Sequence, residues 1–138
     1  MRLLNVSTYK VEEFLESRVP LYAILSHTWG RDEVSFRDIQ RLRTAKKKSG
    51  FAKIVHTCAQ AKVDRLAYAW IDTCCIDKSS SAELQETINS MYRWYAQAKI
   101  CYAYLADVYD PSNNVQVADK GFVTVSYTHL TLPTKRIV

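Results

Sequence analysis

Three short apolar segments, separated by two stretches of helical periodicity, constrain the fold of this chain most strongly. The apolar segments span residues 22–26, 66–71 and 100–106, and apolar residues recur at helical spacing in 50–62 and in 81–98. Continuously apolar strands that alternate with amphipathic helices are typical of a parallel sheet with helices on both faces. The order therefore predicts a three-layer α/β fold, doubly wound and flavodoxin-like, with right-handed crossovers.

The second predicted helix has a clear start and a clear apolar stripe. Ser80 followed by Glu83 predicts a capping box at its first turn, and Ser35 with Asp38 predicts the same for a short earlier helix. The stripe of the second helix is expected to face the core. Its members are Leu84, Ile88, Met91, Tyr92 and Tyr95.

The carboxyl ends of the three predicted strands mark the candidate site, because parallel α/β sheets bind ligands beyond those ends. No glycine-rich phosphate loop and no supported Ser-His-Asp arrangement is present, so no catalytic residue is assigned. The candidate ligand-binding residues are Ser26, His27, Trp29, Gly30, Asp72, Cys74 and Asp107.

Four of these candidates have two interpretations each, which the sequence leaves open. Ser26 lines a ligand cleft or caps the turn, and His27 is a general base or a hydrogen-bonded turn residue. Trp29 stacks on a base or nicotinamide ring, or it packs on the strand ends. Asp72 holds a ribose hydroxyl, or it forms a cap or ion pair. Gly30 is free to adopt a positive φ in the turn.

Other features narrow the function by exclusion. Cys58, Cys74, Cys75 and Cys101 form no Cys-x-x-Cys pair and fit no zinc spacing, so we expect buried thiols and no metal. Asp77 and Lys78 are expected to form a local ion pair. Neither a membrane span nor a secretory signal is recognisable, and a cytoplasmic location is expected.

The end of the chain has a different origin from the rest in our interpretation. Residues 124–134 read TVSYTHLTLPT, which resembles the translation of a sequencing-library adapter, so we expect native sequence over residues 1–123 only. Lys135 and Arg136 account for two of the 19 basic residues, and without them the formal charge falls from +5 to +3. One basic cluster remains, and we expect it to be solvated rather than to contact nucleic acid. It contains Arg41, Arg43, Lys46, Lys47 and Lys48.

Two motifs resemble a known family. Residues 22–30, YAILSHTWG, with EVSF at 33–36, resemble the opening motif of the fungal heterokaryon incompatibility (HET) domain. Residues 70–78, WIDTCCIDK, resemble its second motif, and the resemblance continues in order to about residue 110. The resemblance implies a fungal module for non-self recognition that triggers programmed cell death and works with protein partners or by self-association.

A weaker similarity connects the chain with Toll/interleukin-receptor (TIR) domains, which have a comparable layout of strands. Some TIR domains cleave NAD with a glutamate on a segment after the third strand. The HET family carries a Gly-Trp-Thr-Leu-Gln-Glu motif there, and this chain has no such sequence. The similarity therefore implies a TIR-like fold that is truncated at its C-terminus, with NAD as a cofactor or substrate of the whole family member rather than of this chain. We expect residues 1–123 alone to aggregate, because a three-stranded half-sheet leaves an edge uncovered.

Overall fold

The structure is a computed structural model that describes residues 1–104 and 122–126. The sheet has six strands in the order β2-β1-β4-β3-β5-β6. The strands are β1 (Arg2–Asn5), β2 (Val11–Glu13), β3 (Tyr22–His27), β4 (Tyr68–Trp70), β5 (Ile100–Tyr104) and β6 (Phe122–Ser126). The helices are the 3-10 turn η1 (Glu16–Arg18), α1 (Phe36–Ile39), α2 (Leu42–Ala45), α3 (Phe51–Val63), α4 (Asp72–Cys75) and α5 (Ser81–Gln97).

The three predicted strands form the parallel centre of this sheet. β3 pairs in parallel with β4 on one side and with β5 on the other, so the first of the three predicted strands lies in the middle. The apolar run at residues 66–71 is shorter as a strand than predicted, because Asp72 already begins α4. The parallel arrangement of the three strands is confirmed.

The prediction of a wholly parallel sheet was wrong. β1 pairs antiparallel with β4 and forms a hairpin with β2, and β6 pairs antiparallel with β5. β1 contains Leu3 and Leu4, which are both fully buried. This short apolar segment therefore suits an inner position in the sheet. The sheet is therefore mixed, and the edges of the parallel centre are covered on both sides.

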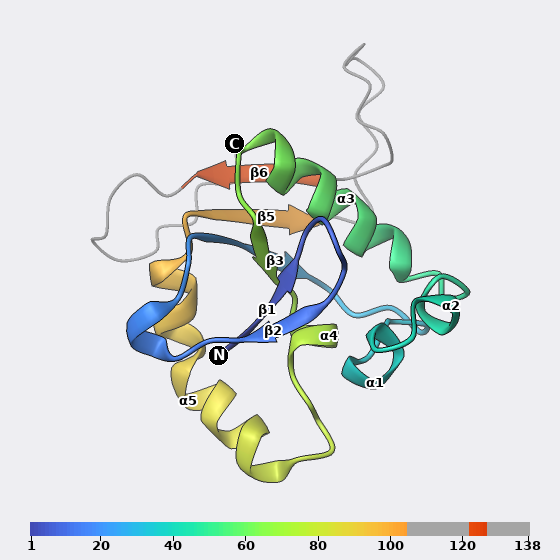
Figure 1. Cartoon of the computed structure of the whole chain (residues 1–138), viewed down its shortest axis with the longest axis horizontal. Coiled ribbons are helices and arrows are strands. Elements are labelled where there is room, and N and C mark those ends of the chain that lie inside the picture. The colour runs from blue at the N-terminus through green and yellow to red at the C-terminus, as the bar shows by residue number, and fades with distance from the viewer. Residues whose placement is uncertain (105–121, 127–138) are drawn as a thin grey trace.

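Helices cover both faces of the sheet (Figure 1). His27 of β3 contacts Lys53 of α3, whereas Tyr22 of the same strand donates a hydrogen bond of 2.5 Å to the carbonyl of Trp94 in α5. Residues 22 and 27 lie on opposite faces of a strand, because successive side chains alternate. α3 and α5 therefore form the two outer layers, as predicted.

The stripe predicted for α5 is confirmed in part, because Leu84, Met91 and Tyr95 are partly buried and pack against the core. Ile88 and Tyr92 are 57% and 64% exposed, while the buried residues of the helix are Thr87, Ser90 and Trp94. These three lie on one face at a spacing of three and four residues. Trp94 packs edge to face against Trp70 of β4, with ring centroids 5.8 Å apart, and this bulky contact turns two small polar residues toward the sheet.

The two predicted capping boxes have different outcomes. Ser35 and Asp38 form a complete box at α1, in which each side chain accepts a backbone N–H of the other residue. At α5 the Ser80 side chain accepts from the Glu83 N–H at 3.3 Å. The Glu83 carboxylate instead pairs with Arg2 and accepts the Asp77 N–H, so the second box is only half formed.

Candidate functional site

Asp72 connects two other candidate residues at the carboxyl end of the parallel strands. Its Oδ1 lies 2.7 Å from Nε2 of His27, and its Oδ2 accepts a hydrogen bond of 2.8 Å from the indole Nε1 of Trp29. His27 ends β3, and Asp72 lies two residues after the end of β4, so the parallel pairing of these strands brings both residues to one edge. The structure thus brings together three of the predicted site residues.

Lys53 of α3 completes the surroundings of His27. Its Nζ lies 3.2 Å from His27 Nδ1 and donates to the carbonyl of Thr28 at 3.0 Å. An ammonium group has only donors, so Nδ1 of the imidazole is the acceptor and Nε2–H donates to Asp72. The His27 side chain is 1% exposed, and both ring nitrogens are therefore satisfied inside the protein.

Glu33 ties the loop after β3 to the same cluster. Its carboxylate pairs with Lys53 and accepts the Gly30 N–H at 2.8 Å. The Gly50 N–H donates to the Asp32 carbonyl at 2.9 Å, so the loop also touches the start of α3. Gly30 was expected to be free for a positive φ, but its backbone does not lie in the left-handed region.

The electrostatics favour an ionised Asp72. Burial acts to raise the pKa of Asp72, but the hydrogen bonds from His27 and Trp29 and the nearby Lys78 outweigh it, and the pKa is lowered. Lys78 lies with its Nζ 2.9 Å from the centroid of the Trp29 ring, a cation–π contact. Burial lowers the pKa of Lys78, against the opposing charge of Asp72.

The prediction of an ion pair between Asp77 and Lys78 was wrong. Asp77 instead accepts from the Ser79 hydroxyl at 2.6 Å and from the Ser79 N–H at 3.1 Å. This short turn leaves Lys78 to reach over Trp29. A neighbouring serine that closes a turn satisfies an aspartate more readily than the adjacent lysine does.

The side chains of Ser26 and Cys74 hydrogen-bond to partners outside the Asp72 cluster. Ser26 hydrogen-bonds Tyr95 of α5, and this bond opposes the rise that burial causes in the pKa of Tyr95. Cys74 is fully buried, and its Sγ donates to the Ile71 carbonyl at 3.9 Å. A hydrogen bond with Cys75, together with burial, raises the pKa of Cys74. Asp107 lies outside the described residues.

All four cysteines are free and buried, as expected. Burial raises the pKa of Cys58 to about 12, which keeps this thiol protonated and unreactive near neutral pH. Within residues 1–104 and 122–126, no group of three or more histidine, cysteine, aspartate or glutamate side chains is arranged to hold a metal ion. In the same part of the chain, no helix has the length and apolarity to cross a membrane.

Sequence reasoning missed Lys53, Glu33 and the role of Lys78. Lys53 lies off the apolar face of its helix, which is the usual position of a solvated lysine. Its partners are 20 and 26 residues earlier, so no local spacing signals the contact. Glu33 belongs to the EVSF segment at residues 33–36 of the first family motif, and this motif was the signal that could have marked it as a site residue.

The arrangement is chemically a closed network. Both oxygens of Asp72 and both nitrogens of His27 accept or donate hydrogen bonds within the protein. The Asp72 side chain is 23% exposed, whereas Trp29 as a residue is 51% exposed. The network therefore fixes the loop at residues 28–33 against the sheet and presents the Trp29 ring, with Lys78 over it, at the surface.

Comparison with known proteins gives one family and one relative. The family model described as "Heterokaryon incompatibility protein (HET)" matches residues 22–130. The vegetative incompatibility protein HET-E-1 of Podospora anserina is 56% identical over 93 residues, which are 66% of this chain. The chain spans only 7% of the length of that relative. No solved structure matches.

The family model covers both motifs that form the network around Asp72, namely residues 22–36 and 70–78. It also covers the three parallel strands of the sheet and the helices between them. The chain therefore belongs to the heterokaryon incompatibility protein (HET) family.

Proposed function

We propose that this chain is the N-terminal part of a HET domain that acts in fungal non-self recognition and signals programmed cell death. The observation that carries the proposal is its 56% identity to a vegetative incompatibility protein. We place this activity in the cytoplasm, since four free cysteines suit a reducing compartment.

The geometry supports a binding and signalling role rather than catalysis by this chain. A general base needs an accessible nitrogen or oxygen within reach of substrate. His27 is buried, and its two nitrogens face Asp72 and Lys53. The network instead stabilises one conformation of the loop that carries Trp29, and a fixed exposed aromatic is a common anchor for a protein partner.

The strand order supports a further part of the proposal. The parallel strands lie in the order second, first, third along the chain, which is how a flavodoxin-like sheet begins. We therefore extend the proposal to a flavodoxin-like, TIR-like core. In that fold the functional surface lies where the strand order reverses, and His27 ends the strand at that position.

A chimaera tests the proposed function. The segment of HET-E-1 that matches this chain is replaced in Podospora anserina with the corresponding residues of this chain. We expect the chimaeric strain to keep its incompatibility reaction, because the two segments are similar enough to share one fold. Asp72→Ala in the chimaera is expected to abolish the reaction, since the loop then loses its anchor.

Glu16→Ala is the matched control, because its exposed ion pair with Arg93 lies outside the network. Immunoblots confirm equal protein levels in all strains. A chimaera that is present at the normal level without any reaction contradicts the proposal. An unchanged reaction in the Asp72→Ala strain contradicts the role given to the network.

The NAD-cleaving alternative is tested separately. The 138-residue chain is incubated with NAD, and released nicotinamide is measured by chromatography. We expect no release above a boiled sample, because the chain carries no Gly-Trp-Thr-Leu-Gln-Glu segment. Release that disappears in Asp72→Ala favours an enzyme instead, and concentration-dependent oligomers without release favour a self-association module.

A further inference from the structure

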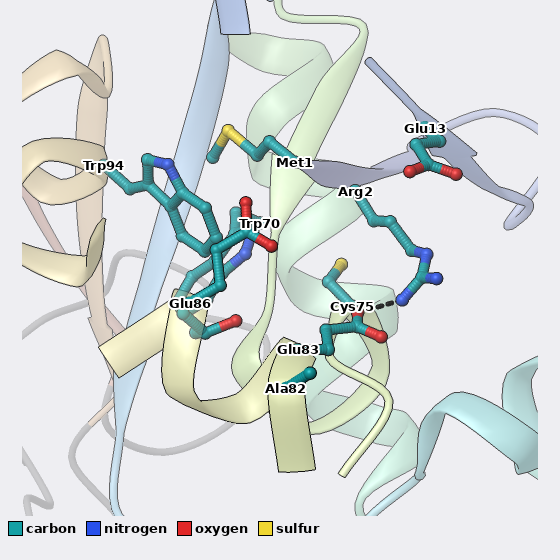
Figure 2. Close-up of a pocket in the computed structure, with 10 residues that line it drawn as sticks. Met1, Arg2, Glu13, Trp70, Cys75, Ala82, Glu83, Glu86 and Trp94 are labelled. Atoms are coloured by element: carbon teal, nitrogen blue, oxygen red, sulfur yellow. Dashed lines mark hydrogen bonds and ion pairs between the residues drawn. The ribbon is translucent and has the colours of Figure 1, made fainter. Parts of the chain in front are cut away.

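A pocket of about 240 Å³ lies on the α5 face of the sheet, apart from the Asp72 network. Its walls come from the start of β1, the ends of β2, β4 and α4, and one side of α5 between residues 82 and 94 (Figure 2). Ligand sites for drug-sized molecules span about 300–1,000 Å³, so this pocket suits one side chain better than a nucleotide. Six lining residues carry the argument: Arg2, Glu13, Trp70, Glu83, Glu86 and Trp94.

The pocket lining has an excess of one negative charge, because Glu13, Glu83 and Glu86 face only Arg2 and the ammonium group of Met1, which donates to the Phe14 carbonyl. Arg2 pairs with Glu83 and lies over the ring of Phe36 at 4.7 Å. Glu13 also interacts electrostatically with Arg2, whereas Glu86 has no ion pair or hydrogen bond within the described part of the chain. Figure 2 shows the Glu86 side chain extending from α5 into the space between Trp94 and Arg2. The pocket therefore has carboxylate charge available for a cation.

The aromatic wall supplies a second, independent observation. Trp94 is 4% exposed, and its indole Nε1–H has no acceptor within the described part of the chain. Figure 2 shows this nitrogen on the side of the ring that faces Met1, another residue of the pocket lining. Buried tryptophan N–H groups normally find an acceptor. A ligand that presents a carbonyl oxygen here satisfies that donor.

A metal ion does not fit these observations. The carboxylates of this pocket are not gathered into a metal-binding group within residues 1–104 and 122–126. A bare cation also offers nothing to the Trp94 donor. A cation on an apolar stem that also bears a carbonyl matches all three features, namely the carboxylates, the two indole rings and the unsatisfied N–H.

We infer that this pocket binds an arginine or lysine residue. Its cationic head pairs with Glu86 and Glu13, its stem packs on Trp70, and its carbonyl accepts from Trp94. The same chemistry is available from an internal residue of a peptide or from the free amino acid. This site is independent of the proposed role of the Asp72 network, so either inference can fail alone.

The test follows the Trp94 indole N–H signal of the ¹⁵N-labelled 138-residue chain by NMR, with Trp94→Phe used to assign it. The probe is Nα-acetyl-arginine N-methylamide, and we expect a saturable shift of this signal. The citrulline analogue has the same shape without the charge, and it should bind about tenfold more weakly, since charged hydrogen bonds contribute that much. Free arginine distinguishes the sources: tighter binding of the amide indicates a peptide segment, and tighter binding of free arginine indicates the amino acid.

Two variants complete the test. Glu86 is an exposed residue of α5, so the Glu86→Gln variant should fold. We expect it to bind the arginine probe about tenfold more weakly. Glu16→Gln, outside the pocket, should bind normally. The inference is overturned if the probe gives no saturable shift, if citrulline binds as tightly as arginine, or if Glu86→Gln leaves the affinity unchanged.

Discussion

Removing the Asp72 carboxylate should destabilise the whole loop after β3. In Asp72→Ala, the Nε2–H of His27 keeps its buried position and loses its acceptor. An unsatisfied buried donor costs about 1–3 kcal/mol, and we expect a loss of that size in the free energy of unfolding measured with urea. Glu16→Ala breaks only an exposed pair and should change stability by about 1 kcal/mol or less. Equal effects of the two variants would contradict the importance of the network.

The same carboxylate should make stability depend on pH. The pKa of Asp72 is lower in the folded chain than its ordinary value of 3.8, so the ionised form favours folding. This contribution is complete above the unfolded pKa and disappears as the pH falls through the folded pKa. The stability difference between wild type and Asp72→Asn should therefore stay constant at neutral pH and shrink as the pH falls through 3.8 and then through the lower pKa of the folded chain. A difference that grows on acidification would reverse the assigned sign.

Gly50 and Gly30 offer a matched pair of substitutions. A Cβ at Gly50 would lie 2.8 Å from the Asp32 carbonyl oxygen and 2.9 Å from the Glu33 Cα, so backbone must move. At Gly30 the nearest atom is Glu33 Oε1 at 3.4 Å. We expect Gly50→Ala to cost about 1–3 kcal/mol by overpacking and Gly30→Ala to cost much less, as measured by thermal unfolding. Similar melting temperatures for the two variants would contradict this.

The site residues that lie in the two sequence motifs could be predicted. Residues that join the site only through a contact between distant elements of the fold could not. His27, Trp29 and Asp72 end or follow strands, and strand ends can be read from the sequence. Lys53 reaches His27 only because α3 crosses that face of the sheet. No rule of spacing connects a helix residue with a strand residue 26 positions earlier.

At the scale of elements, the end of α3 carries a residue that its backbone does not favour. Arg65 has φ 61°, in the left-handed region. The Leu66 N–H donates to the Ala61 carbonyl at 2.8 Å and the Arg65 N–H to Lys62 at 3.0 Å, which is the Schellman pattern that normally uses glycine. Arg65→Gly should stabilise the fold by about 1 kcal/mol in urea unfolding, because glycine adopts this conformation without strain. Arg65→Ala is the control and should give no such gain; a stabilisation by alanine equal to that by glycine would exclude strain as the cause.

The elements themselves were easier to predict than their orientation. The ranges of α3 and α5 follow from periodicity and from Ser80. The face that α5 buries does not, since Trp94 anchors the helix on Trp70 and leaves Ile88 exposed. The hairpin of β1 and β2 was missed because its strands are four and three residues long, too short for a clear alternation.

For the whole molecule, the edge of the parallel sheet decides whether a shortened chain stays monomeric. β6 pairs with β5 through residues 122–126, and part of this strand belongs to the adapter-like sequence. Backbone groups make this pairing, so it is compatible with a foreign origin of those residues. A chain that ends at residue 123 loses the partners of Ile100, Cys101 and Tyr102 and exposes part of an edge. We expect it to associate, as measured by light scattering against the 138-residue chain; a monomer that melts sharply and reversibly would contradict the expectation.

The place of β1 in the sheet has a consequence for synthesis on the ribosome. Leu4 leaves the exit tunnel well before Ala69, which is its neighbour in the sheet. The nascent chain can close the β1–β2 hairpin early, but the hairpin cannot dock until β4 has been translated. β1 is thus made before β4 but cannot take its place in the sheet until β4 follows, and until then an emerging chain must keep Leu3 and Leu4 from other contacts.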